Sequence, residues 1–166
     1  RPWLGMYAAE SDDTIVVVNS TVTQNTAAGA GAIDADHSGV DVTLVYSDVV
    51  GNTVQSGVDC GLDVVVPGEA QGATEDGQDG EDGEASGTAV AVSEGANVTL
   101  GPDGTLSAFG TVIALPTGGS NCAGDETSAT TSAGYNYSDD ASCGLTASTD
   151  VQNGADPKLG ALADNG

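Results

Sequence analysis

The 166-residue sequence predicts an all-β fold, a parallel β-helix (solenoid) built from a few stacked coils. A unit repeats at an offset of 27 residues, most large apolar residues are valine, and turn-forming residues are abundant. Branched valine suits a pleated strand, whereas Gly, Asp, Asn, Ser and Thr favour turns and caps over helix interiors. A sandwich of short antiparallel strands, like that of immunoglobulins, is the alternative.

The repeat is clearest between residues 15–26 (IVVVNSTVTQNT) and residues 42–53 (VTLVYSDVVGNT). Across this offset Val17 falls on Leu44, and the apolar residues two positions earlier also coincide, which keeps one strand face apolar. A unit this short cannot bury its own apolar face. We therefore expect the copies to stack and to share one continuous core.

A looser third copy lies further along the chain. Residues 96–100 resemble residues 40–44, and residues 105–112 follow the rest of the unit with a slip of one residue. This alignment predicts that residues 96–100 continue the stack on residues 40–44.

The repeated Asn25 and Asn52 occupy the same phase in the two best copies. In a stacked coil they would lie about 4.8 Å apart, so their amides are predicted to bond along a ladder. The alternative is that Asn-Thr is only a turn dipeptide.

The charge balance excludes one class of partner. The chain has 25 acidic and 2 basic residues, a net charge of −23. A nucleic-acid binder needs a basic surface, so nucleic acid is not expected as a partner, and docking on anionic lipid is disfavoured. No apolar run approaches the ~20 residues of a membrane span.

Residues 68–87 (GEAQGATEDGQDGEDGEASG) contain seven acids and no large apolar residue, which indicates a solvated loop inserted between coils. Asp76, Asp79 and Asp82 recur every third residue and form a candidate weak calcium site, and no other cofactor is expected. Their spacing is not that of an EF-hand loop, and a plain charged loop is the alternative.

These patterns predict five segments. They are an N-terminal cap or linker (1–13), coils (14–67), the acidic insertion (68–87), further coils (88–117) and a loop-rich C-terminal segment (118–166). The chain has neither an initiator Met nor a signal peptide, so we expect a mature product or a piece of a longer protein. The acidic surface and the three cysteines favour an extracellular setting.

The C-terminal third contains a string of short motifs: NCAG at 121–124, GYN at 134–136, DD at 139–140, CGL at 143–145 and DPKLGALADNG at 156–166. This string resembles the end of the choice-of-anchor Q surface proteins of bacteria. The resemblance implies a right-handed parallel β-helix with repeats like those of polymorphic outer-membrane proteins, and a place at the cell surface. It implies no catalytic residues.

Cys122 and Cys143 both belong to the matching motifs, so the resemblance implies that they form a disulfide. Closing a loop of this length would stabilise the fold by about 3 kcal/mol. Cys60 is then left over, as a buried apolar residue or an intermolecular linker.

An enzyme of the β-helix class is the alternative to a structural protein. Lyases that act on uronates need cationic groups, and the chain has no Arg or Lys between residues 2 and 157. Hydrolysis needs only two carboxylates, for which Asp34 with Asp36 and Asp139 with Asp140 are candidates, although turn formation explains each pair more simply. His37, the single histidine, is expected in an exposed turn.

Three sequons begin at Asn19, Asn97 and Asn136 and are candidate glycosylation sites. The sequence as a whole favours a secreted or cell-surface structural protein without catalysis, such as a stalk, an adhesin segment or a filament subunit. Its expected partners are further copies, joined head to tail, or cell-surface and extracellular matrix components. The alternative is a carbohydrate-binding or glycoside-hydrolysing β-helix module that uses Asp carboxylates.

Overall fold

The computed structural model describes residues 5–27, 29–55 and 94–160, and in these residues the fold is all-β, with fourteen strands and no helix. The strands form three four-stranded sheets, A, B and C, and a two-stranded sheet D. Every pairing between named strands is parallel. None of the described residues belongs to a helix long and apolar enough to cross a membrane.

Each sheet collects strands that lie far apart in the sequence. Sheet A contains β1 (Met6–Tyr7), β5 (Ile33–Ala35), β9 (Gly95–Leu100) and β12 (Ser120–Gly124). Sheet B contains β2 (Thr14–Val18), β6 (Asp41–Val45), β10 (Thr105–Phe109) and β13 (Ala129–Gly134). Sheet C contains β3 (Thr21–Thr23), β7 (Asp48–Val50), β11 (Val112–Ala114) and β14 (Tyr137–Ser138), and sheet D contains β4 (Thr26–Ala27) and β8 (Thr53–Val54).

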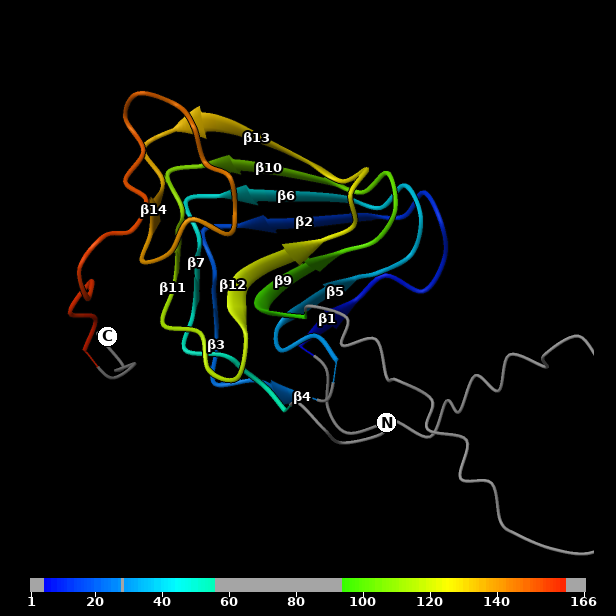
Figure 1. Ribbon diagram of the computed structural model, residues 1–166, viewed down its shortest axis with the longest axis horizontal. Coiled ribbons are helices and arrows are strands. Elements are labelled where there is room, and N and C mark those ends of the chain that lie inside the picture. The colour runs from blue at the N-terminus through cyan, green and yellow to red at the C-terminus, as the bar shows by residue number, and fades with distance from the viewer. Residues whose placement is uncertain (1–4, 28, 56–93, 161–166) are drawn as a thin grey trace, which may run out of the picture.

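Within the residues that the structure describes, the chain therefore passes through sheets A, B and C in the same order four times, and each passage is called a round. Figure 1 shows the equivalent strands of successive rounds stacked beside one another. The stacking of parallel strands that the repeat predicts is confirmed, and the antiparallel sandwich is wrong for the described strands.

The register between the first two rounds follows the sequence repeat. Val17 pairs with Leu44, and Val22 pairs with Val49, each at an offset of 27. Both Val17 and Leu44 are buried in the core. Alternation along each strand directs these side chains inward, because successive side chains of a strand point to opposite faces.

The looser third copy is placed differently by the structure. Residues 96–100 belong to sheet A, where Val98 pairs with Ile33, and the residue paired with Val42 is Leu106. The alignment of residues 96–100 with residues 40–44 is therefore wrong. Strands in different sheets share the same alternation of apolar and polar residues, so a short pattern fits more than one strand of a round.

The insertion leaves the register of the sheets intact. Val42 and Leu106 are 64 residues apart, which is 37 more than the offset of 27 between the first two rounds. Residues 56–93 fall between β8 and β9, and they include the acidic segment. The candidate calcium residues Asp76, Asp79 and Asp82, and also Cys60, lie outside the described residues.

Single residues in the left-handed conformation turn the chain at three corners in each of the first three rounds and at one corner in the fourth. They are Asp12, Gly39 and Asp103 between sheets A and B; Asn19, Tyr46, Gly110 and Tyr135 between sheets B and C; and Gln24, Gly51 and Leu115 after sheet C. Members of each set occupy the same phase of the repeat. One residue with positive φ redirects the strand without a long loop, which keeps successive rounds in register.

The core runs through the middle of all four rounds. Its members include side chains that have no exposed surface, namely Ile33, Val42, Leu44, Val49, Val98, Leu106 and Ile113. Ile15 and Val22 in the first round are only partly buried, since their strands have a neighbour on one side. Each round thus covers the next, as expected for a unit that cannot bury its own apolar face.

Two predicted segment boundaries differ from the structure. Residues 1–13, expected as a cap or linker, include β1, which joins sheet A. Residues 118–166, expected as a loop-rich segment, include β12, β13 and β14, which complete a fourth round. The strands of that round are rich in Ser, Thr, Ala and Gly, so their apolar alternation is weak and the sequence pattern does not reveal them.

Residues 139–153 follow β14 and close the last round; they are called the closing segment. Cys143 and Leu145 are buried in the core, and Val151 forms a parallel bridge with Tyr137. In Figure 1 this segment, in orange, folds back beside the stack. The last round is therefore covered by the chain itself.

Candidate functional site

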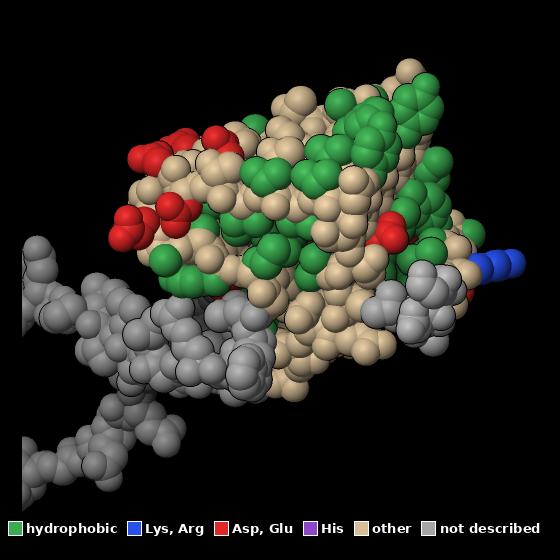
Figure 2. All heavy atoms as spheres, turned by 180° about the vertical axis from the view of Figure 1, so that it is seen from behind, with side chains coloured by type: hydrophobic (Ala, Val, Ile, Leu, Met, Phe, Trp, Pro, Cys, Tyr) green, Lys and Arg blue, Asp and Glu red, His purple; other side chains and the backbone are tan. Residues whose placement is uncertain are grey.

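Acidic side chains gather in the connections from sheet A to sheet B. In order of the rounds they are Glu10, Asp12 and Asp13; Asp36; Asp103; and Asp125 and Glu126. Figure 2 shows acidic side chains gathered at one end of the visible face. Some of them form turns, because Asp13 Oδ2 accepts the backbone N–H groups of Ala9 (3.2 Å) and Glu10 (3.1 Å).

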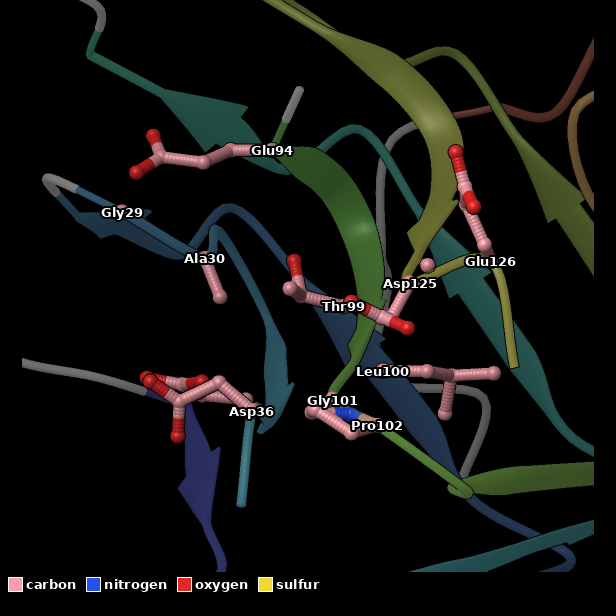
Figure 3. Close-up of a pocket in the computed structure, with 12 residues that line it drawn as sticks. Gly29, Ala30, Asp36, Glu94, Thr99, Leu100, Gly101, Pro102, Asp125 and Glu126 are labelled. Atoms are coloured by element: carbon pink, nitrogen blue, oxygen red, sulfur yellow. The ribbon is translucent and has the colours of Figure 1, made fainter. Parts of the chain in front are cut away.

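A pocket of about 430 Å³ opens at this end of the molecule. It is lined by the carboxyl groups of Asp34, Asp36, Glu94, Asp125 and Glu126, and by uncharged residues that include Thr99, Leu100 and Pro102. In Figure 3 the labelled carboxyl groups come from three separate connections: after β5, before β9 and after β12. Stacking alone brings these carboxyl groups together.

Glu94 has the most unusual environment in the pocket. Burial raises the pKa of the Glu94 carboxyl, and a hydrogen bond from the backbone of Gly29 opposes this effect. A raised pKa is one property of the general acid in glycoside hydrolysis, which also needs a second carboxylate across the substrate. In Figure 3 the side chain of Glu94 points away from Asp125 and Glu126.

Asp34 and Asp36, a pair predicted from the sequence, both line this pocket. Asp36 Oδ1 lies 2.8 Å from His37 Nδ1, and the ring of His37 packs edge-on against Tyr7 at 5.7 Å between centroids. His37, expected in an exposed turn, has a side chain that is 35% exposed and lies in the bend after β5. The sequence did not point to Glu94, Asp125 or Glu126, because only the stacking of rounds places them beside Asp34.

Asp139 and Asp140, the other predicted pair, lie in the closing segment and not in the pocket. Asp139 Oδ1 accepts a hydrogen bond from Asn121 Nδ2 (2.6 Å), and Asp140 Oδ2 accepts one from the backbone N–H of Asn121 (2.9 Å). Burial raises the pKa of Asp140, but hydrogen bonds from Ser142 and Asn121 outweigh burial, and the net pKa is lowered. These carboxylates hold the closing segment against β12.

The predicted pair of stacked asparagines is part of a longer ladder. Asn25 Nδ2 donates to Asn52 Oδ1 (3.0 Å), and Asn52 Nδ2 donates to Asn97 Oδ1 (2.8 Å). Asn97 Nδ2 donates to Asn121 Oδ1 (2.7 Å), and Asn121 donates in turn to Asp139. Asn97 and Asn121 come from strands of sheet A, whereas Asn25 and Asn52 come from the corner after sheet C. The ladder satisfies buried amides that would otherwise destabilise the core.

The sequons differ in their accessibility. Asn97 and Asn136 are buried, with amides donating to Asn121 and to the backbone carbonyl of Ala108, so neither can carry a glycan in the folded chain. Both candidates are therefore corrected to structural residues. Asn19 is exposed at the corner between sheets B and C.

The predicted disulfide is present in the structure. The sulfur atoms of Cys122, in β12, and Cys143, in the closing segment, are bonded across a sequence separation of 21. The bond therefore attaches the closing segment to sheet A.

Residues 5–27, 29–55 and 94–160 contain no group of three or more His, Cys, Asp or Glu side chains arranged to hold a metal ion. Comparison of the chain with protein-family models, with curated proteins and with solved structures found no match.

Proposed function

We propose that this chain is a right-handed parallel β-helix that serves as a structural scaffold outside the cell or on its surface. The observation that carries the proposal is the asparagine ladder, which joins all four rounds into one hydrogen-bonded column. Right-handedness is the strong preference of parallel strands joined by crossover connections. The motif string of the C-terminal third supports the same class of protein, the choice-of-anchor Q surface proteins.

The surface chemistry supports a location outside the cell. A disulfide persists in oxidising surroundings, and one joins the closing segment to β12. A net charge of −23 keeps neighbouring copies and anionic polymers apart. Cell-surface or extracellular matrix components without strong negative charge are therefore the proposed partners.

The closing segment favours a stalk over a filament subunit. A head-to-tail contact needs an open edge at each end of the stack, because unpaired strands are what a neighbouring copy would extend. Cys143 and Leu145 cover the last round, so a second copy would have to displace them. We therefore propose a stalk first, and head-to-tail assembly into a filament second.

The scaffold proposal predicts that the protein does not cleave polysaccharides. To test this, the purified chain is incubated with a panel of soluble polysaccharides and the released reducing ends are measured. A scaffold releases none, and size-exclusion chromatography shows a single species. Release that disappears in an Asp36→Asn variant would contradict the scaffold proposal.

The second candidate function is a glycoside-hydrolysing module, favoured by the raised pKa of Glu94 in the acidic pocket. In this proposal Glu94 is the general acid and one of the remaining carboxylates activates water. A Glu94→Gln variant would then lose the release of reducing ends. A matched Asp103→Asn variant, in the same set of connections but outside the pocket lining, would keep it.

A further inference from the structure

A row of aromatic side chains runs along the corner between sheets B and C. Tyr46, Phe109 and Tyr135 come from the second, third and fourth rounds and are called the aromatic strip. Their ring centroids are 5.1 Å apart between Tyr46 and Phe109, and 6.2 Å apart between Phe109 and Tyr135. Tyr46 is 58% exposed and Tyr135 is 68% exposed.

The backbone gives no reason for tyrosine at these positions. Tyr46 and Tyr135 adopt φ of 48° and 58°, a left-handed conformation that is unfavourable for residues with a bulky side chain. Equivalent positions of the other rounds hold Asn19 and Gly110, the residue types that adopt this conformation most readily. The corner requires this conformation but not an aromatic ring, so the two tyrosines are retained although each costs about 1–2 kcal/mol.

Gly110 makes room for the strip. A Cβ atom on Gly110 would lie 2.8 Å from the ring of Tyr46, so any other residue would push that ring away. The glycine lets the Tyr46 ring lie over the backbone of the next round. The strip is therefore an ordered surface whose position is set by local packing.

A row of hydroxyl groups lies beside the strip on the outer face of sheet B. Thr43 pairs with Ser107, and Ser107 pairs with Thr131. These residues alternate with buried positions such as Leu44 and Leu106, so their side chains point outward. Within the described parts of the chain none of the three hydroxyl groups donates or accepts a hydrogen bond. They are available to an external ligand.

We propose that the aromatic strip and this hydroxyl row together bind an uncharged polysaccharide chain that lies along the stack. Apolar rings flanked by hydroxyl groups provide apolar contact together with directed hydrogen bonds, the combination found in ligand sites. A polymer of repeating sugars can contact successive rounds in the same way, because the rounds repeat along the stack.

The charge of the surface selects the class of sugar polymer. None of the six residues is charged, although the chain as a whole carries −23. Figure 2 shows hydrophobic side chains gathered at the corner of the visible face away from the acidic end. A polyuronate would be repelled by the surrounding field, whereas a neutral polymer would not.

The three rings of the strip are by themselves too small for a stable protein interface. A stable protein interface buries about 800 Å² on each side, whereas three aromatic side chains supply about 450–750 Å² in total. Part of that area is already covered, because the rings pack on one another. Exposed Val16 and Val18, which pair with Thr43 and Val45, continue the apolar surface into the first round, so this surface runs along the stack as a linear polymer would.

Affinity electrophoresis with laminarin, mannan and dextran tests the proposal, with polygalacturonate as the anionic comparison. Wild-type protein is retarded by at least one neutral polysaccharide and not by polygalacturonate. Tyr46→Asn and Tyr135→Asn each weaken that binding about ten-fold. Asparagine suits the left-handed backbone, so both variants fold. Tyr7→Ala, which removes a 36% exposed tyrosine on sheet A, leaves binding unchanged.

Three results would overturn the proposal. One is the absence of retardation by all three neutral polysaccharides. Another is binding that survives in the double Tyr46→Asn, Tyr135→Asn variant. The third is a change of oligomeric state in that variant without any polysaccharide binding by the wild type, which would assign the strip to a contact between copies. A Glu94→Gln variant separates this site from the acidic pocket, since it leaves binding at the strip intact.

Discussion

At the scale of single residues, the most informative positions are polar groups inside the stack. Asn52, Asn97 and Asn121 have no exposed surface, and each donates a hydrogen bond to a neighbour in the ladder. No side-chain polar atom buried in the described residues lacks a hydrogen-bond partner. Such a network specifies one arrangement of the rounds, because any slip would break several bonds at once.

Asn97→Ala is expected to lower the free energy of unfolding by about 2–4 kcal/mol, since it removes the hydrogen bond that Asn52 Nδ2 donates to Asn97 and leaves the buried Asn121 Oδ1 without its donor. Urea denaturation followed by circular dichroism measures this change. Asn25→Ala, at the partly exposed end of the ladder, serves as the control and is expected to cost less. Equal losses for the two variants would contradict the importance of the buried column.

Tyr46→Asn is expected to change the unfolding free energy by less than about 1 kcal/mol. Relief of the left-handed conformation gains about 1–2 kcal/mol, whereas loss of the ring contact with Phe109 costs about 0.5–1.5 kcal/mol. Thermal melting provides the measurement. Phe109→Asn, in a strand with no strained backbone to relieve, destabilises the protein and acts as the comparison.

At the scale of elements, the closing segment decides how the stack ends. Asp150 is central to it, since its carboxylate accepts hydrogen bonds from Ser132 Oγ (2.5 Å), the backbone N–H of Asn136 (3.0 Å) and the backbone N–H of Ala147 (2.8 Å). Burial raises the pKa of Asp150, but these hydrogen bonds outweigh it, so the net pKa is lowered from 3.8.

A lowered pKa gives a defined dependence of stability on pH. The stabilisation from Asp150 is present in full above the unfolded-state value of 3.8 and is lost as the pH falls through the folded-state pKa. The difference in unfolding free energy between wild type and Asp150→Asn is therefore expected to shrink below that pH. Chemical denaturation at neutral pH and in acid measures it. A difference that grows on acidification would contradict the assigned direction.

The disulfide between Cys122 and Cys143 also holds the closing segment in place. Replacing Cys122 and Cys143 by serine is expected to lower the unfolding free energy by about 3 kcal/mol and to speed hydrogen exchange in β12, β13 and β14. Exchange in β2 and β6, at the other end of the stack, serves as the internal control. If hydrogen exchange became equally faster in every sheet, the disulfide would stabilise the whole stack and not the last round alone.

At the scale of the whole molecule, charge opposes compaction. The net charge of −23 repels itself, and added salt screens exposed charges beyond about 8 Å at physiological ionic strength. The melting temperature is expected to rise with added NaCl. A comparison with CaCl₂ at equal ionic strength separates screening from calcium binding. A melting temperature that does not respond to NaCl would contradict this expectation.

Sequence patterns predicted much of this architecture. The offset of 27 between Val17 and Leu44 predicts their pairing, and inward alternation in the strands around them predicts the core. The repeat therefore predicts which strands of the first two rounds pair and which face of each strand points into the core. The same pattern failed for residues 96–100, because an apolar alternation is shared by strands of sheets A and B and does not say which sheet a strand joins.

The candidate sites depended more strongly on tertiary structure. Asp34 and Asp36 were identified from their proximity in sequence, but Glu94 and Asp125 reach the same pocket only through stacking. The aromatic strip is likewise invisible in the sequence, where Tyr46 and Phe109 are far apart.

By itself, the sequence determined the all-β class, the parallel stacking of the first two rounds and the negative surface, because these follow from residue type and a fixed period. Only the tertiary structure decided where the rounds after the insertion rejoin the stack, which amides extend the ladder and which side chains meet across rounds. The physical reason is that a stacked fold brings together residues separated by an insertion of arbitrary length. The sequence distance between such residues then carries no information about their distance in space.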